Sequence, residues 1–339
     1  MTADAPWRRF FRIASLTAAI PVIISFLFVA VIDPWDGLPF SPRLPRVPVT
    51  PSTRHAWPML ARDARFDSVV IGTSTSRLLR PELLDRLFDA RFVNLSIDAA
   101  TAYEEIRLLE VFSHSHPTPR FILLGVDANW CDPRPEQRYT VYPFPEWLYQ
   151  PRRWHGYMQL LNVYALQEAG SQLWAMAGRK PARHRWDGYT DFAIPDSQYD
   201  LVRASANILA GGTAFAPDVL EGAIFSTHER LRDALRTMPR SARKVLFFVP
   251  FALSYQGGEN SLTRAYWAEC KRRVVEMAKA TSGTLVVDFM IPSPITSDNS
   301  HYYDAIHYRP VIAERIATSL AEVIAGGTEA SADYVVLTR

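Results

Sequence analysis

A run of about twenty residues without a charged side chain, Ile13–Ile32, lies near the N-terminus. At about 1.5 Å of rise per residue, a helix of this length spans the roughly 30 Å hydrocarbon layer of a membrane. Arginines precede the run, and Asp33 and Asp36 follow it, which places the N-terminus in the cytoplasm by the positive-inside rule. No small-residue cleavage site precedes Asp33, so we predict an uncleaved signal anchor over residues 13–32, after a basic cytoplasmic flank over 1–12. The rest of the chain is then expected outside the cytoplasm, as the periplasmic part of a single-pass inner-membrane protein.

The segment after the anchor, residues 33–64, is rich in proline. Prolines at this frequency disfavour regular helix and sheet and favour an extended, semi-rigid spacer. We therefore predict a linker over residues 33–64, followed by one domain over 65–326 and a tail over 327–339.

Strand and helix signals alternate through most of the predicted domain. Apolar runs predict strands at residues 68–72, 91–95, 121–126, 244–249 and 284–288. Helices are predicted from Pro81, from a capping box that begins at Thr101, and over residues 218–237, 261–280 and 310–325, the last ending at Gly326–Gly327. Strands separated by helices form parallel sheets with helices on both faces. The expected fold is a flavodoxin-like three-layer α/β/α sandwich with about five parallel strands.

The alternation pauses over residues 131–216, which are rich in tryptophan, tyrosine, arginine and proline. Loops at the carboxyl edge of a sheet often carry binding function. The segment that contains Arg153 and Trp154 could form a cleft for sugar rings or anionic groups. The alternative is a small helical lid with an aromatic core of its own. Both interpretations of this predicted insertion stay open.

Charge and cysteine content exclude several classes of protein. The formal net charge is +2, and the arginines are interleaved with acidic residues, which argues against a nucleic-acid partner. Cys131 and Cys270 are the two cysteines of the chain. They cannot define a disulfide framework or a metal site, so we expect free or buried thiols, and neither a metal nor a cofactor.

A serine follows the first predicted strand, in Gly72-Thr73-Ser74. In a parallel sheet, ligands bind outside the carboxyl ends of the strands. A serine on such a turn can act as a nucleophile if a histidine accepts its proton and backbone N–H groups stabilise the oxyanion. Serine also caps turns of this kind, so the motif alone does not decide between the two roles.

An Asp-x-x-His pair precedes the last predicted helix. The carboxylate of Asp304 could bond the imidazole of His307 and fix the tautomer whose other nitrogen accepts the serine proton. A second pair, Asp298 and His301, has the same spacing. We prefer His307 because it lies closest to the helix start at Pro310, and His301 is the alternative base.

Together, these motifs resemble the SGNH (GDSL-like) hydrolase superfamily, in particular its membrane-anchored members associated with exopolysaccharide and cell-envelope acylation. The resemblance covers residues 66–130 and 243–325. It implies that Ser74 is the nucleophile and that Asp304 and His307 complete the triad. In place of the family's oxyanion glycine and asparagine, this sequence offers Ala99 and, two positions later than expected, Asn129.

The third block of the family reads Gly125-Val126-Asp127-Ala128-Asn129 here. An ionised Asp127 would repel an oxyanion. The oxyanion hole would then be formed by the Ser74 and Ala99 N–H groups and by Asn129. Further candidate substrate-binding residues are Asp127, Trp130, Arg153 and Trp154.

The sequence therefore predicts a serine esterase or O-acetyltransferase that acts on an envelope or secreted polysaccharide. A transferase would need a partner that exports the acyl group, such as a multi-pass membrane acyltransferase. The alternative is a non-catalytic assembly or glycan-binding subunit of an exopolysaccharide machinery that keeps the fold.

Overall fold

The structure is a computed structural model that describes residues 4–136, 139–215 and 219–338. The chain divides into two compact units. One contains Met1–Met59 and Pro145–His184, and the other contains Leu60–Phe144 and Arg185–Arg339. The predicted ends of the insertion at residue 216, of a helix at 218 and of the tail at 339 lie outside the described residues.

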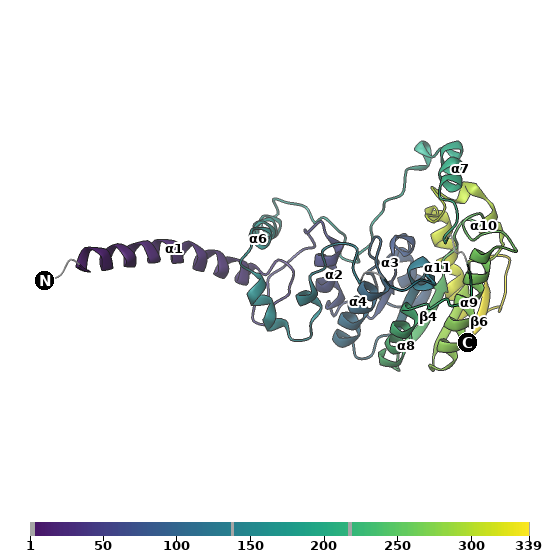
Figure 1. The fold of residues 1–339 in the computed structure, drawn as a ribbon, viewed down its shortest axis with the longest axis horizontal. Helices are drawn as coiled ribbons and strands as arrows, with labels where there is room; N and C mark the ends of the chain where they lie inside the picture. The colour runs from purple at the N-terminus through teal and green to yellow at the C-terminus, as the bar shows by residue number, and fades with distance from the viewer. Residues whose placement is uncertain (1–3, 137–138, 216–218, 339) are drawn as a thin grey trace. The chain divides into compact units, whose positions relative to one another are not determined.

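The first unit begins with the long helix α1 (Asp4–Ile32) (Figure 1). Its stretch Pro6–Ile32 is, in the described part of the chain, the one helix long and apolar enough to cross a membrane. Only 11% of its most apolar window is buried. The predicted anchor is therefore a helix of suitable length and composition.

The proline-rich segment of this unit is folded, whereas we predicted an extended spacer. Trp35 is buried, and its indole N–H donates to Thr50 Oγ1 at 2.9 Å. The Thr50 hydroxyl in turn donates to Glu168 Oε2 at 2.7 Å, on α6 (Val163–Met176). Prolines limit the backbone of this segment, but the side chains between them pack. The segment also ends in a helix, α2 (Thr53–Ala61), despite the internal Pro58.

The predicted insertion does not form one lid, because its residues 145–184 belong to the first unit. The remaining short elements of the insertion region are α5 (Ala128–Cys131), η2 (Glu146–Tyr149), η3 (Arg153–Gln159), η4 (Asp196–Gln198) and α7 (Leu201–Ala210). Its part within the second unit therefore comprises α5, η4, α7 and the loops beside them.

The second unit contains a six-stranded sheet in the order β2-β1-β3-β4-β5-β6. The strands are β1 (Ser68–Ile71), β2 (Phe92–Asn94), β3 (Phe121–Val126), β4 (Arg243–Phe248), β5 (Thr284–Asp288) and β6 (Val335–Thr338). The first five are parallel and have the flavodoxin-like order, as predicted. The sixth, which we had placed in the tail, pairs antiparallel with β5.

Helices cover both faces of this sheet (Figure 1). They are α3 (Pro81–Phe88), α4 (Ala102–Ser115), α8 (Thr227–Thr237), α9 (Leu262–Lys279) and α11 (Pro310–Ile324), with η1 (Ser74–Ser76), α10 (Pro294–Ser297) and η5 (Asn299–His301) at loop positions. Helix α3 contacts α11, while α4 contacts α8 and α8 contacts α9. The predicted capping box at Thr101 is present, and β3 and β4 are almost entirely buried. The predicted three-layer fold is confirmed.

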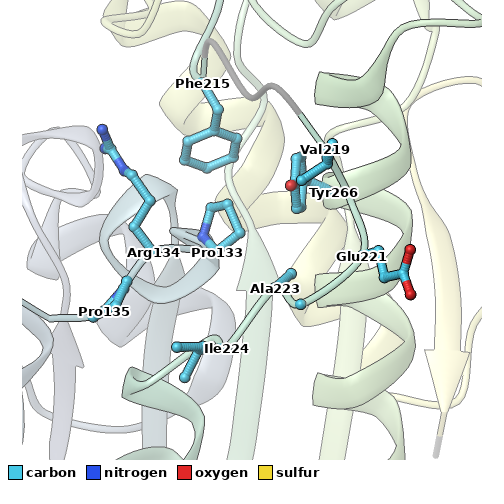
Figure 2. Close-up of a pocket in the computed structure, with 10 residues that line it drawn as sticks. Pro133, Arg134, Pro135, Phe215, Val219, Glu221, Ala223, Ile224 and Tyr266 are labelled. Atoms are coloured by element: carbon cyan, nitrogen blue, oxygen red, sulfur yellow. The ribbon is translucent and has the colours of Figure 1, made fainter.

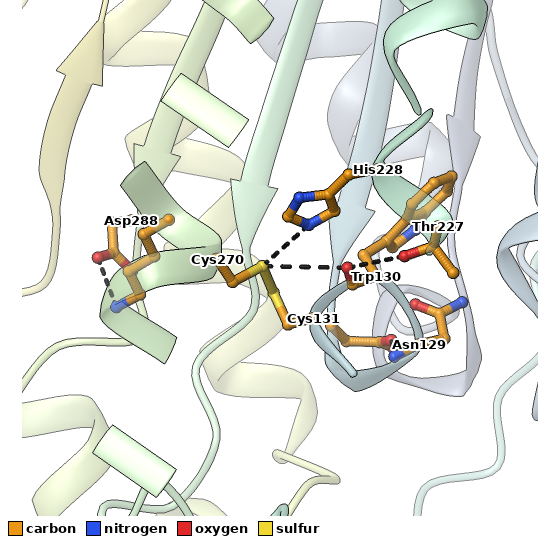
Figure 3. The surroundings of a disulfide bond; sticks show 9 residues. Asn129, Trp130, Cys131, Thr227, His228, Cys270 and Asp288 are labelled. Atoms are coloured by element: carbon orange, nitrogen blue, oxygen red, sulfur yellow. Dashed lines mark hydrogen bonds and ion pairs between the residues drawn. A yellow bond between two sulfur atoms is a disulfide. The ribbon is translucent and has the colours of Figure 1, made fainter. Parts of the chain in front are cut away.

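A disulfide joins Cys131 on α5 to Cys270 on α9, so our expectation of two free or buried thiols was wrong (Figure 3). The two residues are 139 positions apart, and both are fully buried. The sequence carries no signal for this pair, because only the packing of α5 against α9 brings the sulfurs together. The bond ties α5, which directly follows β3, to the helix between β4 and β5.

Candidate active site

The turn that carries Ser74 is shaped by close packing after β1. Thr73 caps the short helix η1, and its hydroxyl accepts from the Thr75 N–H. A Cβ atom at Gly72 would lie 2.5 Å from Ser76 Oγ, and one at Gly125 would lie 2.1 Å from it. Ser76 therefore fits only because Gly72, directly after β1, and Gly125, within β3, carry no side chain. Ser74 is the first residue of η1, at the carboxyl end of β1.

Ser74 and His307 are in hydrogen-bond contact. Ser74 Oγ lies 2.8 Å from His307 Nε2. His307 Nδ1 lies 2.8 Å from Asp304 Oδ2. The other carboxylate oxygen of Asp304 accepts the backbone N–H groups of Ile306 and His307, at 2.9 and 2.8 Å. The three predicted residues therefore form one continuous hydrogen-bonded chain.

The Asp304 carboxylate is stabilised in its charged form. Burial raises its pKa, but the His307 hydrogen bond, the His307 charge and the two N–H groups lower it by more, so the net shift is downward. A carboxylate that stays ionised can hold the imidazole in one orientation. Asp304 has the electrostatics expected of the orienting member of a triad.

The alternative base, His301, is bonded elsewhere. Its Nδ1 lies 3.1 Å from the Ile295 carbonyl oxygen, and its Nε2 lies 3.8 Å from Asp298 Oδ2. The geometry therefore favours His307 of the two Asp-x-x-His pairs.

One side chain that sequence reasoning missed packs against His307, and a second packs against the first. The Phe192 ring packs edge-on against the imidazole, with centroids 5.8 Å apart. The Arg77 guanidinium carbon lies 5.8 Å from the centroid of the same phenyl ring, and the guanidinium pairs with Asp98. Phe192 lies in the predicted insertion, whose aromatic composition left a cleft and a small helical lid open and did not single out this residue.

Asp127 lies under the Ser74 turn rather than in an open pocket. Its Oδ2 accepts the Thr73 hydroxyl and, at 3.1 Å, the Thr75 hydroxyl. Burial raises its pKa, an effect that these hydroxyls and the Asn129 N–H partly offset. Asp127 therefore braces the turn, and it is 4% exposed, which does not fit the predicted contact with substrate.

The Asn129 amide does not serve as the predicted oxyanion donor. Its Nδ2 donates to the Ala100 carbonyl at 3.1 Å and to Glu105 Oε1 at 2.6 Å. Trp130, predicted to bind substrate, is fully buried, and its indole N–H donates to Glu105 Oε2 at 3.0 Å. Burial, and next the Asp127 charge, raise the Glu105 pKa well above its usual value. Asn129 and Trp130 therefore both donate to Glu105, a buried acid that no sequence pattern singled out.

The remaining predicted site residues have separate environments. Ala99 adopts a left-handed backbone with φ of 49°, the region that favours the glycine of the resembled family. Arg153 belongs to the first unit, where its guanidinium donates to the Gly37 carbonyl at 3.4 Å. Trp154, in the same unit, is exposed and packs on His155. Substrate binding by Arg153 and Trp154 stays a prediction.

A separate pocket of about 320 Å³ is lined in part by the residues that follow α5 in the chain (Figure 2). Its walls include Pro133, Arg134, Phe215, Glu221 and Tyr266. No residue known to line it belongs to the hydrogen-bonded chain of Ser74, His307 and Asp304, as far as the described part of the chain shows.

Comparison with known proteins leaves the family open. No family model matches the chain, and no curated protein matches it. Among solved structures, the chain is similar to "The structure of a putative platelet activating factor from Streptococcus pneumonia", with 10% identity and a TM-score of 0.40. The match covers 80% of this chain and 90% of that one. A likeness of this degree assigns neither family nor function.

Proposed function

We propose that the protein is a serine acyl-ester hydrolase or O-acyltransferase, of the kind found in the SGNH superfamily. The observation that carries the proposal is the chain of two 2.8 Å contacts, from Ser74 Oγ to His307 Nε2 and from His307 Nδ1 to Asp304 Oδ2. A serine hydroxyl needs both partners to become a nucleophile at neutral pH.

In the proposed reaction, Ser74 Oγ attacks the carbonyl carbon of an ester while His307 Nε2 takes the hydroxyl proton. The tetrahedral intermediate collapses, the C–O bond to the leaving alcohol breaks, and the imidazolium gives its proton to that oxygen. Water or a sugar hydroxyl then attacks the acyl-serine while His307 takes the proton of the incoming group. The acyl–Oγ bond breaks, and the imidazolium returns that proton to Ser74 Oγ. Hydrolysis and transfer differ only in this acceptor. Asp304 holds the imidazole throughout.

We place this chemistry outside the cytoplasm. The helix Pro6–Ile32 fits a membrane anchor, and its arginine flank favours a cytoplasmic N-terminus. The Cys131–Cys270 disulfide supports the same side of the membrane, since disulfides persist in oxidising compartments such as the periplasm.

The proposed substrate is an acylated envelope or secreted polysaccharide. The support is the resemblance of FDSVVIGTSTSRLL and YYDAIHYRPVIAERIA to the acylation proteins of exopolysaccharide systems. Exposed aromatic residues such as Trp154 suit the faces of sugar rings. In the transferase version, a multi-pass membrane acyltransferase would supply the acyl group.

One observation favours the second candidate, a non-catalytic assembly or glycan-binding subunit. Asp127 stands where the resembled family places its oxyanion asparagine, and the Asn129 amide is bonded to Ala100 and Glu105. The predicted side-chain donor of the oxyanion hole is therefore engaged elsewhere, and the other predicted donors are the Ser74 and Ala99 backbone N–H groups.

The full chain, purified in detergent, should be treated with a fluorophosphonate probe and assayed with p-nitrophenyl acetate. Labelling is expected in the wild type and in His301→Ala, and it should be lost in Ser74→Ala and His307→Ala. His301→Ala is the matched control, because His301 has the same Asp-x-x-His spacing and no contact with Ser74. A folded wild type that neither labels nor turns over would favour the second candidate.

A further inference from the structure

A cationic groove of about 390 Å³ lies between α8 and α9. Four arginines line it, two from each helix: Arg232, Arg236, Arg272 and Arg273. On α8, His228, Arg232 and Arg236 follow at intervals of four residues, which places them along one face of the helix. On α9, Arg272 and Glu276 repeat the same spacing on the facing side, and Ala280, directly after the helix, continues it.

The positive charge of the groove exceeds what the protein itself neutralises. Arg272 pairs with Glu269 at 2.8 Å and also with Glu276, and Arg273 pairs with Glu269 at 2.7 Å. The α8 arginines, Arg232 and Arg236, are exposed and have no hydrogen-bond or ion-pair partner among the residues that the structure describes. The four guanidinium groups carry four positive charges, and the carboxylates of Glu269 and Glu276 carry two negative ones. The groove therefore has a net charge of +2.

The base of the groove adds no further charge at neutral pH. His228 is 4% exposed there, and burial, together with the neighbouring Arg273 charge, lowers its pKa to about 4. Its Nε2 lies 3.5 Å from Cys270 Sγ, one of the two disulfide sulfurs (Figure 3). The surplus charge is therefore concentrated on the guanidinium groups at the rim.

We propose that this groove binds a phosphate group that carries two negative charges, either as a free phosphate ester or as the headgroup of an anionic lipid. A phosphate near pH 7 carries −1.5 to −2 in one compact group, which matches the surplus. Guanidinium groups bind phosphate oxygens through pairs of charge-assisted hydrogen bonds. A volume of about 390 Å³ accommodates a single phosphate with its first substituents. The site is independent of the proposed acyl chemistry, because none of its lining residues belongs to the Ser74–His307–Asp304 chain.

The test uses the full chain in maltoside micelles and isothermal titration with three probes: inorganic phosphate, soluble dihexanoyl phosphatidic acid, and malonate as a dicarboxylate of the same charge. Phosphate is expected to bind saturably, with a Kd below about 1 mM at low salt, and to raise the Tm. Tighter binding of the phosphatidic acid than of phosphate identifies a lipid headgroup as the source, and equal binding identifies a free phosphate ester.

Arg232→Gln with Arg236→Gln should weaken phosphate binding at least about tenfold, since each loses a charge-assisted contact. The matched control is Arg86→Gln with Arg203→Gln, which removes the same charge from exposed positions outside the groove. The control should bind phosphate within about twofold of the wild type, and both variants should keep the Tm of the ligand-free protein. The proposal is overturned if phosphate does not saturate, if malonate binds equally well, or if the control loses as much affinity.

Discussion

Ser74 Oγ lies 2.8 Å from His307 Nε2, although 233 residues separate the two in sequence. The serine is positioned by the end of β1 and the histidine by the loop that enters α11. The contact therefore depends on the assembled sheet and on the helix that packs beside α3. It is a property of the tertiary fold rather than of either motif.

Asp304→Asn should lower the rate of ester hydrolysis by about 10³- to 10⁴-fold. An amide donor facing His307 Nδ1 would favour the wrong tautomer, so Nε2 would no longer accept the Ser74 proton. The measurement is kcat/KM for p-nitrophenyl acetate. Asp298→Asn, beside His301, is the control and should keep the wild-type rate. Equal losses in both variants would contradict a specific role for Asp304.

Asp127→Asn should increase the rate of fluorophosphonate labelling of Ser74 by about tenfold, because it removes a negative charge that opposes the developing oxyanion. The amide oxygen can still accept the Thr73 and Thr75 hydroxyls, so the turn should remain in place. Asp127→Ala removes the charge and also the acceptor, and it should not show the increase. A slower reaction of the asparagine variant would show that the carboxylate itself supports the chemistry.

Replacement of both Cys131 and Cys270 by serine should lower the free energy of unfolding by about 3–5 kcal/mol. The disulfide joins residues 139 positions apart. Closing a loop of this size removes much conformational entropy from the unfolded chain and so favours the folded state. Urea denaturation of the full chain in detergent measures the change. The wild type in dithiothreitol should match the serine variant, whereas an unchanged midpoint would mean that the cross-link does not form.

Acid should destabilise the protein through His228. Its pKa is lowered to about 4 by burial and by Arg273, against an ordinary value of 6.5. The contribution of neutral His228 to the free energy of unfolding is fully present above pH 6.5. It is lost as the pH falls towards 4, because over this range only the unfolded chain takes up the proton. This amounts to about 2 kcal/mol at pH 5.

Urea midpoints at pH 7.5 and pH 5 should therefore converge in His228→Gln more than in the wild type. His114→Gln is the comparison, since His114 is exposed on α4. If the His228 variant keeps the wild-type pH dependence, the acid sensitivity arises elsewhere.

Much of the fold could be predicted from local patterns. The strand Phe121–Val126 is a continuous apolar run and Thr284–Asp288 is centred on one, and the structure places strands at those residues. The capping box at Thr101 and the glycine pair after α11 follow from the hydrogen bonds of helix ends. Each of these signals lies within a few residues of the element that it predicts.

The features that were missed depend on distant partners. Val335–Thr338 is four residues long, and only β5 identifies it as a strand. Trp35 and Thr50 looked like spacer residues because Thr50, which accepts from Trp35, donates to Glu168, 118 positions further along the chain. Cys131 and Cys270 look like unrelated cysteines until α5 packs on α9.

The candidate site follows the same division. Ser74, Asp304 and His307 were predicted because nucleophile, base and orienting acid stand in short motifs. The buried contacts of Asp127 with Thr73 and Thr75, and of Glu105 with Asn129 and Trp130, have no such motif. A carboxylate in a sequence reveals its charge but not whether hydroxyls or solvent will surround it.

The cross-link between Cys131 and Cys270 has one more consequence, for proteolysis. A single cut anywhere between the two cysteines leaves the two fragments covalently joined, since the bond closes a ring around that whole stretch of chain. Protein nicked in one of the exposed loops of this ring should migrate as one species until it is reduced, and then separate into two. Apparent resistance to proteases in a non-reducing assay would therefore overstate how much of the chain is intact.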